Sequence, residues 1–308
     1  MTEIAYSLSD LDHQPSAVTI GNFDGVHRGH QVLLRRAVDA GRDLGVRSVA
    51  VTFDPHPAAV LRPDSAPPQL QTLQARIEAL AETGVDAVLV LPFTPALAAS
   101  SPADFVADVL ASQLQSVKVV VGTNFRFGAK AAGDVVTLVE LGETHGFVPE
   151  AVTLLEINGR RISSSAVREH LLDGDLAWAL AALGRPYELP GRVVIGEGRG
   201  HEIGFPTANL AVPDDLVVPA FGVYAGHVRL DGQEHPAVTN VGVRPTFRGK
   251  ERTIEAHLLD QELDLYGRDL MVTFEHRIRG ERRFDGPDEL IAQIRIDVEQ
   301  ATGLLGLG

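Results

Sequence analysis

Apolar residues in the first half of the chain form short runs separated by longer amphipathic stretches. The runs are rich in β-branched residues and occupy 17–20, 47–53, 85–91, 117–121 and 151–155. Strands buried on both faces of a parallel sheet show this pattern. After the first run, apolar residues recur at the spacings of one helix face, at Leu33, Ala37, Ala40 and Leu44. Strands alternating with helices predict a Rossmann-like α/β fold with a doubly wound parallel sheet, which binds ligands beyond the carboxyl ends of its strands.

The second half of the chain has strand-like runs with no helical pattern between them. These runs lie at 188–195, 222–230, 235–242, 252–258 and 270–278. Asp231 and Gly232 separate two of them and predict a tight hairpin turn. A helical stripe returns near the end, at Ile291, Ile294, Val298 and Ala301. This order predicts a small antiparallel β-barrel followed by a C-terminal helix.

Glycine and proline interrupt the pattern between the two halves, in the stretch LGRPYELPG at 183–191. We therefore expect one domain over residues 1–184 and a second over residues 187–308. The Pro-rich segment 54–69 is predicted to be a functional loop of the first domain, because sheet-like sequence resumes after it.

Composition limits the partners. The 308 residues include 27 Lys and Arg against 41 Asp and Glu, a formal charge of −14, and no cysteine. An acidic surface repels phosphate backbones and anionic lipids, so we expect neither a nucleic acid nor a membrane partner, although a local nest of amides still accommodates a small anion. The absence of cysteine excludes disulfides and thiolate chemistry. The acidic N-terminus is no secretion signal, and no apolar run reaches the roughly 18 residues that span a bilayer, so a cytoplasmic location is expected.

Two histidines, His27 and His30, stand at the start of the first predicted helix in the stretch VTIGNFDGVHRGH. They could be ordinary polar residues at a helix start, metal ligands together with His56, or phosphate ligands. The metal interpretation lacks an acidic residue at the spacing of known zinc helices. The phosphate interpretation is favoured, because a strand, a glycine-rich turn and a helix start present free amides and the helix dipole to an anion.

A second helix start has the same character. Arg161, Ser163 and Ser164 follow the last predicted strand of the first half, in the stretch RISSSAVR. These residues could simply cap a helix and carry solvated charge. Hydroxyls and a guanidinium at a helix start also suit a triphosphate.

Together these stretches resemble a known family. HRGH at 27–30 with RISSSAVR at 161–168 is similar to the paired signatures of the nucleotidyltransferases related to class I aminoacyl-tRNA synthetases. With FDPHP at 53–57 and GTNFRFG at 122–128, the first half resembles the adenylyltransferase module of the bacterial bifunctional riboflavin kinase/FMN adenylyltransferase (FAD synthetase) family. Many relatives have Asp where Asn124 stands, so the hydrogen-bonding shape is kept here and the charge is lost.

The second half supplies the motifs that such a resemblance leads one to expect. GEGRGHEIGFPTANL at 196–210, FGVYAG at 221–226, NVGVRPTF at 240–247 and IEAHLLD at 254–260 resemble, in order, the motifs of the riboflavin kinase module, an antiparallel β-barrel. The resemblance thus covers most of the chain.

The resemblance implies two substrate sites in the first domain. Its ATP site would consist of Gly21, Asn22, Phe23, Asp24, Gly25, His27, Gly29, His30, Asn124, Arg161, Ser163 and Ser164. Its flavin site would consist of Phe53, Asp54, Pro57, Asn124, Phe125 and Phe127. Phe125 and Phe127 could pack on the isoalloxazine ring, although aromatic residues near strands are more often part of the core. His27 and His30 would be catalytic through the phosphate groups.

The resemblance implies a second pair of substrate sites in the barrel. Its ATP site would consist of Gly196, Gly198, Arg199, Gly200, Gly204, Pro206, Thr207 and Asn209, and its flavin site of Asn240, Gly242, Arg244 and Glu255. Thr207 and Asn209 offer the hard oxygen ligands that Mg²⁺ prefers, although Thr and Asn after Pro are also ordinary turn residues. Glu255 is the candidate general base, or else a solvent-facing strand residue.

The implied function is two sequential reactions on one chain. The second domain would phosphorylate riboflavin with ATP and Mg²⁺, giving FMN and ADP, and the first would join FMN to AMP from a second ATP, giving FAD and pyrophosphate. Homo-oligomerisation is left open. One alternative is a different small-molecule nucleotidyltransferase, which leaves unexplained the predicted barrel with its Pro-Thr-Ala-Asn segment at 206–209. The other is a non-catalytic flavin-binding protein.

Overall fold

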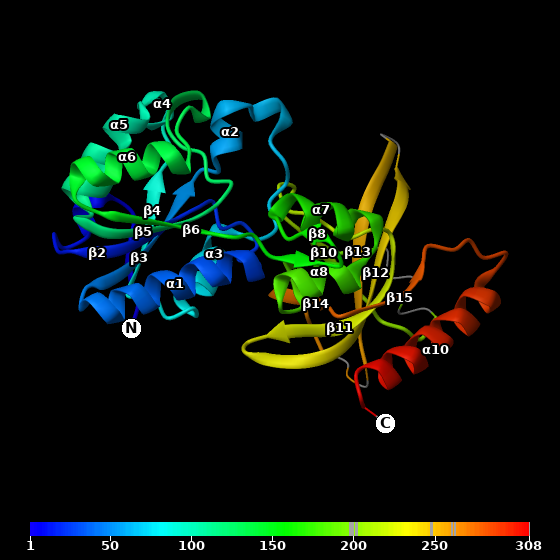
Figure 1. Ribbon diagram of the computed structural model, residues 1–308. Coiled ribbons are helices and arrows are strands. Elements are labelled where there is room, and N and C mark those ends of the chain that lie inside the picture. Colours follow the sequence, from blue (N-terminus) through cyan, green and yellow to red (C-terminus); the bar gives the residue numbers. More distant parts are fainter. Residues whose placement is uncertain (197–199, 201–202, 247–248, 260, 262, 308) are drawn as a thin grey trace. The chain divides into compact units, whose positions relative to one another are not determined.

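The computed structural model describes residues 1–196, 200, 203–246, 249–259, 261 and 263–307, with backbone alone for 244–246 and 249–251. The chain forms two compact units, Met1–Ser164 and Ser165–Gly308 (Figure 1). Helices α7 (Ser164–Asp173) and α8 (Leu176–Leu183) therefore group with the second unit, ahead of the junction predicted near residues 183–191. The domain limits expected from the sequence, 1–184 and 187–308, stay a prediction.

A parallel sheet forms the centre of the first unit, all of whose residues the structure describes. Its six strands lie in the order β1-β4-β3-β2-β5-β6, and every pairing is parallel. Their bounds are β1 Glu3–Ala5, β2 Ser16–Ile20, β3 Arg47–Asp54, β4 Ala87–Pro92, β5 Ser116–Gly122 and β6 Val148–Val152. All five predicted runs contribute strands, β6 lies slightly earlier than predicted, and β1 was not predicted. The chain winds outward from β2 in both directions, which confirms the predicted doubly wound fold.

Helices cover both faces of this sheet, and a hydrophobic cluster lies under each layer. Helices α1 (Arg28–Leu44) and α3 (Leu73–Ala81) cover one face, and α4 (Pro95–Ala99), α5 (Pro102–Phe105) and α6 (Val135–His145) cover the other (Figure 1). A π-helical segment, Val106–Gln113, continues α5, and α2 is a short helix at Pro57–Leu61. Short 3-10 turns occur at Leu8–Asp10, Pro63–Ser65 and Ala129–Ala131, and β7 (Glu156–Ile157) pairs with β8 (Arg160–Arg161).

The buried face of α1 corrects one sequence prediction. Leu33, Leu34, Ala37 and Gly41 are buried, whereas Leu44 is 56% exposed, so the predicted stripe fails at its last position. Gly41 lies on the buried face because a Cβ there would be 2.9 Å from the carbonyl oxygen of Val46. The C-terminal end of α1 therefore packs closely against the chain that enters β3, and only a residue without a side chain fits at position 41.

The second unit is a closed antiparallel barrel. Among its described residues, six strands close in the order β9-β10-β13-β12-β11-β14, and β15 pairs with residues 222–225 of β11, on the same edge as β14. Their bounds are β9 Tyr187–Val194, β10 Ala208–Ala211, β11 Gly222–Leu230, β12 Gln233–Thr246, β13 Gly249–Leu258, β14 Asp269–Phe274 and β15 His276–Gly280. Asp231 and Gly232 take positive φ angles of 51° and 79° in the predicted hairpin turn. The predicted run 270–278 is two strands, β14 and β15.

Helix α10 (Pro287–Leu304) follows the barrel, as predicted (Figure 1). Ala301 and Val298 pack on barrel residues of β11 and β12, including Val223 and Val238. No helix within the described part of the chain is long and apolar enough to cross a membrane.

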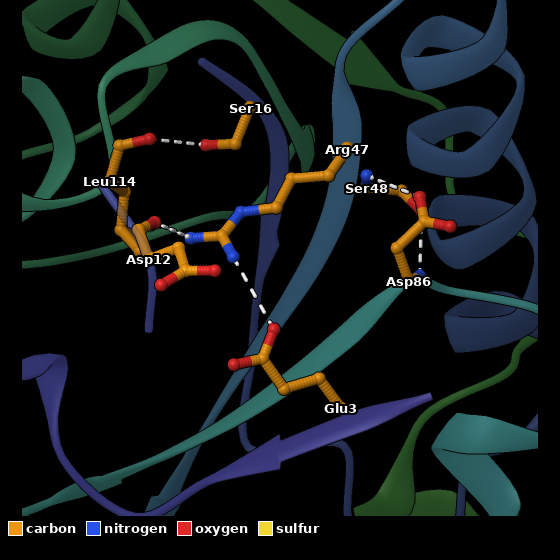
Figure 2. A network of polar contacts seen from close by, with 7 residues as sticks. All are labelled: Glu3, Asp12, Ser16, Arg47, Ser48, Asp86 and Leu114. Atoms are coloured by element: carbon orange, nitrogen blue, oxygen red, sulfur yellow. Dashed lines mark hydrogen bonds and ion pairs between the residues drawn. The ribbon is translucent and has the colours of Figure 1, made fainter. Parts of the chain in front are cut away.

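Polar contacts hold the amino edge of the parallel sheet (Figure 2). The guanidinium of Arg47, whose side chain is 7% exposed, donates to the carbonyl oxygen of Asp12 at 2.6 Å and lies 3.5 Å from the carboxylate of Glu3. The carboxylate of Asp86 accepts hydrogen bonds from the backbone N–H and the hydroxyl of Ser48, at 2.8 and 2.7 Å. These contacts join the starts of β1, β3 and β4, so the edge opposite to the predicted site has a structural role.

Replacing Arg47 by Met should therefore destabilise the first unit. Removal of a buried hydrogen-bonded charge is expected to lower the free energy of unfolding by about 1–3 kcal/mol. Urea unfolding followed by circular dichroism measures this change. Arg42→Met, at an exposed position on α1, is the control. Equal stability of the two variants would contradict the assignment.

Candidate active sites

The motifs that are scattered along the first half meet at the carboxyl edge of the parallel sheet. GNFDG follows β2, FDPHP overlaps the end of β3, and Asn124 follows β5. The stretch that contains Arg161 follows β6. Because parallel strands end at the same edge, the sheet brings all four segments to one side of the unit, at the point where its winding changes direction.

His27 and His30 form a stacked pair at the start of α1. His27 caps the helix, and its Nδ1 accepts a hydrogen bond from the backbone N–H of His30 at 3.2 Å. The two rings stack with centroids 3.6 Å apart, and the ring of Phe23 packs edge-on to His30 at 5.2 Å. A Cβ at Gly29 would lie 3.1 Å from the His27 ring, so this glycine makes room for the pair. In neutral His27 the proton is therefore on the other ring nitrogen, Nε2, which is a hydrogen-bond donor.

The surroundings of His30 favour the neutral form of its ring. Burial, and to a smaller extent the neighbouring His27, lower the pKa of His30 well below its ordinary value of 6.5. Its Nδ1 atom is buried and has no hydrogen-bond partner among the described residues. A buried polar atom without a partner costs free energy, which a bound ligand could relieve.

Ser164, the last residue of the first unit, contacts the loop at residues 21–27. The hydroxyl of Ser164 donates to the carbonyl oxygen of Asp24 at 2.8 Å. The carboxylate of Asp24 is buried and accepts the backbone N–H of Leu70 at 2.9 Å. Ser163 is half-buried beside Ser164, and Arg161 is exposed on β8. The structure thus brings Ser164 to residues 21–27, the histidine loop, and leaves the side chain of Arg161 at the surface.

The predicted flavin residues fall into an exposed and a buried set. Asn124 is exposed and Phe125 is half-buried, with its ring stacked on that of Phe127 at 5.3 Å. Phe127 lies in the hydrophobic core, where it also contacts Phe105. Its position indicates a packing role, and its contact with a flavin stays a prediction.

The segment after β3 supplies the other predicted flavin residues. The ring of Phe53 packs edge-on to Phe93 at 5.6 Å, the carboxylate of Asp54 is 45% exposed, and Pro57 begins α2. His56 caps α2, with its Nδ1 accepting the N–H of Ala58 at 3.1 Å. Among the described residues, no three His, Asp or Glu side chains gather in a way that could hold a metal. The metal interpretation of the histidine pair therefore gains no support.

Arg76 belongs to this site, although the sequence analysis did not single it out. Its side chain is 1% exposed, and it donates to the carbonyl oxygen of Asn22 at 2.9 Å. The signal in the sequence was weak, since a charged residue in an amphipathic helix is usually solvated. Only the structure shows that it points inward.

Three polar side chains form a row across the barrel. Glu255 of β13 lies opposite Asn209 of β10 on one side and opposite Asn240 of β12 on the other. All three line a cavity of about 380 Å³, which Thr207 also lines. Along β13, Ile254 and Ala256 are buried while Glu255 is not, so strand alternation turns the carboxylate toward the cavity.

Glycines make close contacts with the predicted metal ligands. A Cβ at Gly196 would lie 2.2 Å from the amide nitrogen of Asn209, and one at Gly200 would lie 3.0 Å from the hydroxyl of Thr207. Gly204 has a φ of 83°. Gly196 and Gly200 therefore lie directly against these two side chains. Gly198 and Arg199 lie outside the described residues.

The flavin residues predicted in the barrel lie on neighbouring strands. A Cβ at Gly242 would approach the amide nitrogen of Asn240 to 3.1 Å, so the glycine leaves room for this side chain. Arg244 is placed in β12 by its backbone alone.

The cavity also contains residues that the sequence analysis did not single out. The Nδ1 atom of His257 lies 2.8 Å from the carbonyl oxygen of Pro206, so it carries the proton and donates to the Pro-Thr-Ala-Asn segment. Arg279 donates to both carboxylate oxygens of Asp297 at 2.7–3.0 Å, and Asp297 is buried on α10. Strand alternation from Glu255 could have indicated His257. Nothing in the sequence paired residue 279 with residue 297.

The fold and the two sites define a two-module transferase, with a nucleotidyltransferase-type α/β module followed by a kinase-type barrel. The sequence profile of the FAD synthetase family matches residues 9–166, and that of the riboflavin kinase family matches residues 183–305. The chain belongs to the bifunctional riboflavin kinase/FMN adenylyltransferase family.

Curated relatives match almost from end to end. The chain is 42% identical to the bifunctional riboflavin kinase/FMN adenylyltransferase of Escherichia coli strain K12, over 98% of this chain and 96% of that one. It is 41% identical to the protein of the same name from Pseudomonas fluorescens, over 95% and 94% of the two chains, and 34% identical to that of Bacillus subtilis, over 93% and 91%.

A solved structure shares both folds. The crystal structure of a protein described as a macrolide-efflux protein from Streptococcus pneumoniae matches with a TM-score of 0.87 and 31% identity, over 97% of each chain. The match includes the α/β unit and the barrel.

The depressed pKa of His30 predicts acid sensitivity. The unfolded chain takes up a proton at His30 below its ordinary pKa of 6.5, whereas the folded chain does not, so stability falls as the pH drops below that value. Between about pH 7.5 and about pH 5.5 we expect this site to remove on the order of 1 kcal/mol of unfolding free energy.

Urea unfolding at the two pH values measures this loss. His30→Asn should abolish it, and His13→Asn, at an exposed histidine, should retain it. The same loss in both variants would contradict the assignment.

Proposed function

We propose that the two activities of the family reside in two separate sites of this chain. In this proposal the carboxyl edge of the parallel sheet transfers AMP to FMN, and the barrel cavity phosphorylates riboflavin. One observation carries the proposal for the barrel: Thr207 and Asn209 line both the cavity that contains Glu255 and a second cavity of about 350 Å³. Two substrates in adjoining cavities could meet at these residues.

In the kinase step, Glu255 would accept the proton of the riboflavin 5′-hydroxyl. The oxygen would then attack the γ-phosphorus of ATP, and ADP would leave. Asn209 and Asn240 lie on either side of Glu255 in the strand register, so they are placed to orient the hydroxyl or the phosphate that it attacks. His257 would keep the Pro-Thr-Ala-Asn segment in place through the carbonyl oxygen of Pro206.

The donor atoms at this place suit Mg²⁺. The hydroxyl of Thr207 and the side-chain carbonyl of Asn209 are hard oxygen ligands, and ATP would supply the other oxygens. Gly196 and Gly200 lie so close to these two side chains that a larger residue at either position would collide with them. A bound Mg²⁺ ion would offset the charge on the phosphates.

In the adenylyltransferase step, the phosphate of FMN is itself a competent nucleophile. It would attack the α-phosphorus of ATP directly, and pyrophosphate would leave without a covalent enzyme intermediate. The chain would supply alignment and charge stabilisation. His27 and His30 would donate to the triphosphate at the amino end of α1, while Arg161, Ser163 and Ser164 would hold it from the other side.

This assignment accounts for more of the chain than the alternatives do. A different nucleotidyltransferase would use the histidine loop but not the row of Asn209, Glu255 and Asn240. A non-catalytic flavin-binding protein would have no need of a buried His30 whose Nδ1 atom lacks a hydrogen-bond partner among the described residues. The cytoplasmic location expected from the sequence is part of the proposal.

Single substitutions should separate the two activities. Glu255→Gln keeps the size of the side chain and removes its basicity, so riboflavin phosphorylation should fall by about 100-fold or more. His30→Ala removes a donor to the triphosphate, so FMN adenylylation should fall by about 100-fold. Each variant is assayed with riboflavin and with FMN as the starting substrate, and chromatography resolves FMN from FAD.

Each variant is expected to retain the other activity within about twofold. Circular dichroism of each variant reports whether the unit that carries the substitution is folded. Loss of both activities from one substitution in a folded chain would overturn the assignment of separate sites.

Removal of the Thr207 hydroxyl should weaken the use of Mg²⁺. In Thr207→Ala we expect the Mg²⁺ concentration for half-maximal kinase activity to rise by about tenfold or more. Thr207→Ser keeps the hydroxyl and should behave like the unaltered chain. A titration with MgCl₂ at saturating riboflavin measures the shift, and identical curves for the Ala and Ser variants would show that Thr207 is no metal ligand.

A further inference from the structure

Arg76 is a buried charge whose hydrogen bonds are incomplete. Its side chain is 1% exposed, and its Nε and Nη2 atoms have no hydrogen-bond partner among the described residues. Burial lowers the pKa of Arg76 from its ordinary value, while the nearby carboxylates of Asp24 and Asp54 oppose that shift. Arginine stays protonated in proteins, so a full positive charge lies here. Burying a charge whose hydrogen bonds are incomplete costs free energy of folding.

The guanidinium reaches both predicted substrate sides of the adenylyltransferase site. Nη1 donates to the carbonyl oxygen of Asn22 at 2.9 Å, in the loop that leads to the histidine pair. Nη2 lies 3.8 Å from the carboxylate of Asp54, in the segment assigned to the flavin. A planar fork with donors in two directions suits such a bridge, whereas the ammonium group of lysine is a single point.

The loop that Arg76 contacts has a strained backbone. Phe23 and Val26 have φ angles of 50° and 38°, a region that residues with a side chain rarely adopt. Such conformations persist when their surroundings hold them. Arg76 and the hydroxyl of Thr52 both donate to the carbonyl oxygen of Asn22, and Gln31 donates to that of Val26.

We propose that Arg76 is a positioning residue for adenylyl transfer, one that joins the histidine loop at Asn22 to the flavin-side carboxylate of Asp54. The proposal rests on the site assigned above. Arg76 is too buried to touch a substrate, so it acts through these two partners. By holding both, it fixes the distance between the nucleophilic phosphate of FMN and the triphosphate of ATP, and small errors in such a distance are costly.

The test compares the kinetics of Arg76→Met and Arg76→Lys in the full chain. We expect kcat/KM for FMN adenylylation to fall by about 100-fold in the Met variant and about tenfold in the Lys variant, which keeps the charge but not the fork. KM should rise by at least about fivefold for ATP and for FMN, because both sides of the site lose their support. Arg35→Met, at an exposed position on α1, is the matched control.

Far-UV circular dichroism of each preparation reports the amount of folded chain, because the riboflavin kinase activity is proposed for the other unit. A merely structural role would lower the apparent kcat with the folded fraction and leave both KM values unchanged, which would overturn the proposal. If Arg76→Met is recovered only as aggregate, the Lys variant decides, and unchanged kinetics there would also overturn it.

A double-mutant cycle with Asp54→Asn tests the bridge itself. If Arg76 acts through Asp54, the double variant should lose about tenfold less than the product of the two single losses. Fully multiplicative losses would overturn the bridge. The proposed site is tested separately, since undiminished adenylylation in His30→Ala would refute that site whatever the Arg76 variants do.

Discussion

Strand pairing positions the proposed site residues of both units. In the first unit, parallel pairing directs the ends of β2, β3, β5 and β6 to one edge, which gathers segments from residue 21 to residue 164. In the barrel, antiparallel register sets Glu255 between Asn209 and Asn240. A slip of one residue would turn the carboxylate to the opposite face, because strand side chains alternate. Function therefore depends first on backbone hydrogen bonds and only then on the side chains.

Burial adjusts the charges at the first site. The chain is acidic overall, with a formal charge of −14, yet its proposed substrates are anions. In the proposed site the histidine loop would meet this difficulty with neutral donors, since burial lowers the pKa of His30 and α1 begins beside it. The full positive charge of Arg76 lies behind the loop, out of contact with solvent. An arrangement of dipoles with a charge at a distance can bind an anion without exposing a basic patch.

Much of the fold was predictable because each element obeys a local rule. Apolar runs became strands of the doubly wound sheet, and Asp231 with Gly232 became the hairpin turn. The errors occurred where tertiary contact overrules local pattern. Leu44 has the spacing of a buried residue but lies beyond the contact of α1 with the sheet, and Gly41 is buried because a backbone approaches it. Strand β10 was missed because its residues read as a turn after proline.

By itself the sequence determined which chemical groups are present and in which motifs, and so the family and the pair of activities. It held the histidine pair, the serines and Glu255 in recognisable stretches. Only the tertiary structure decided which polar groups are buried and which distant residues meet. Such contacts are the hydrogen bonds of Arg76 with Asn22, of His257 with Pro206 and of Arg279 with Asp297. They depend on packing between residues far apart in the chain, and a local pattern carries no information about that separation.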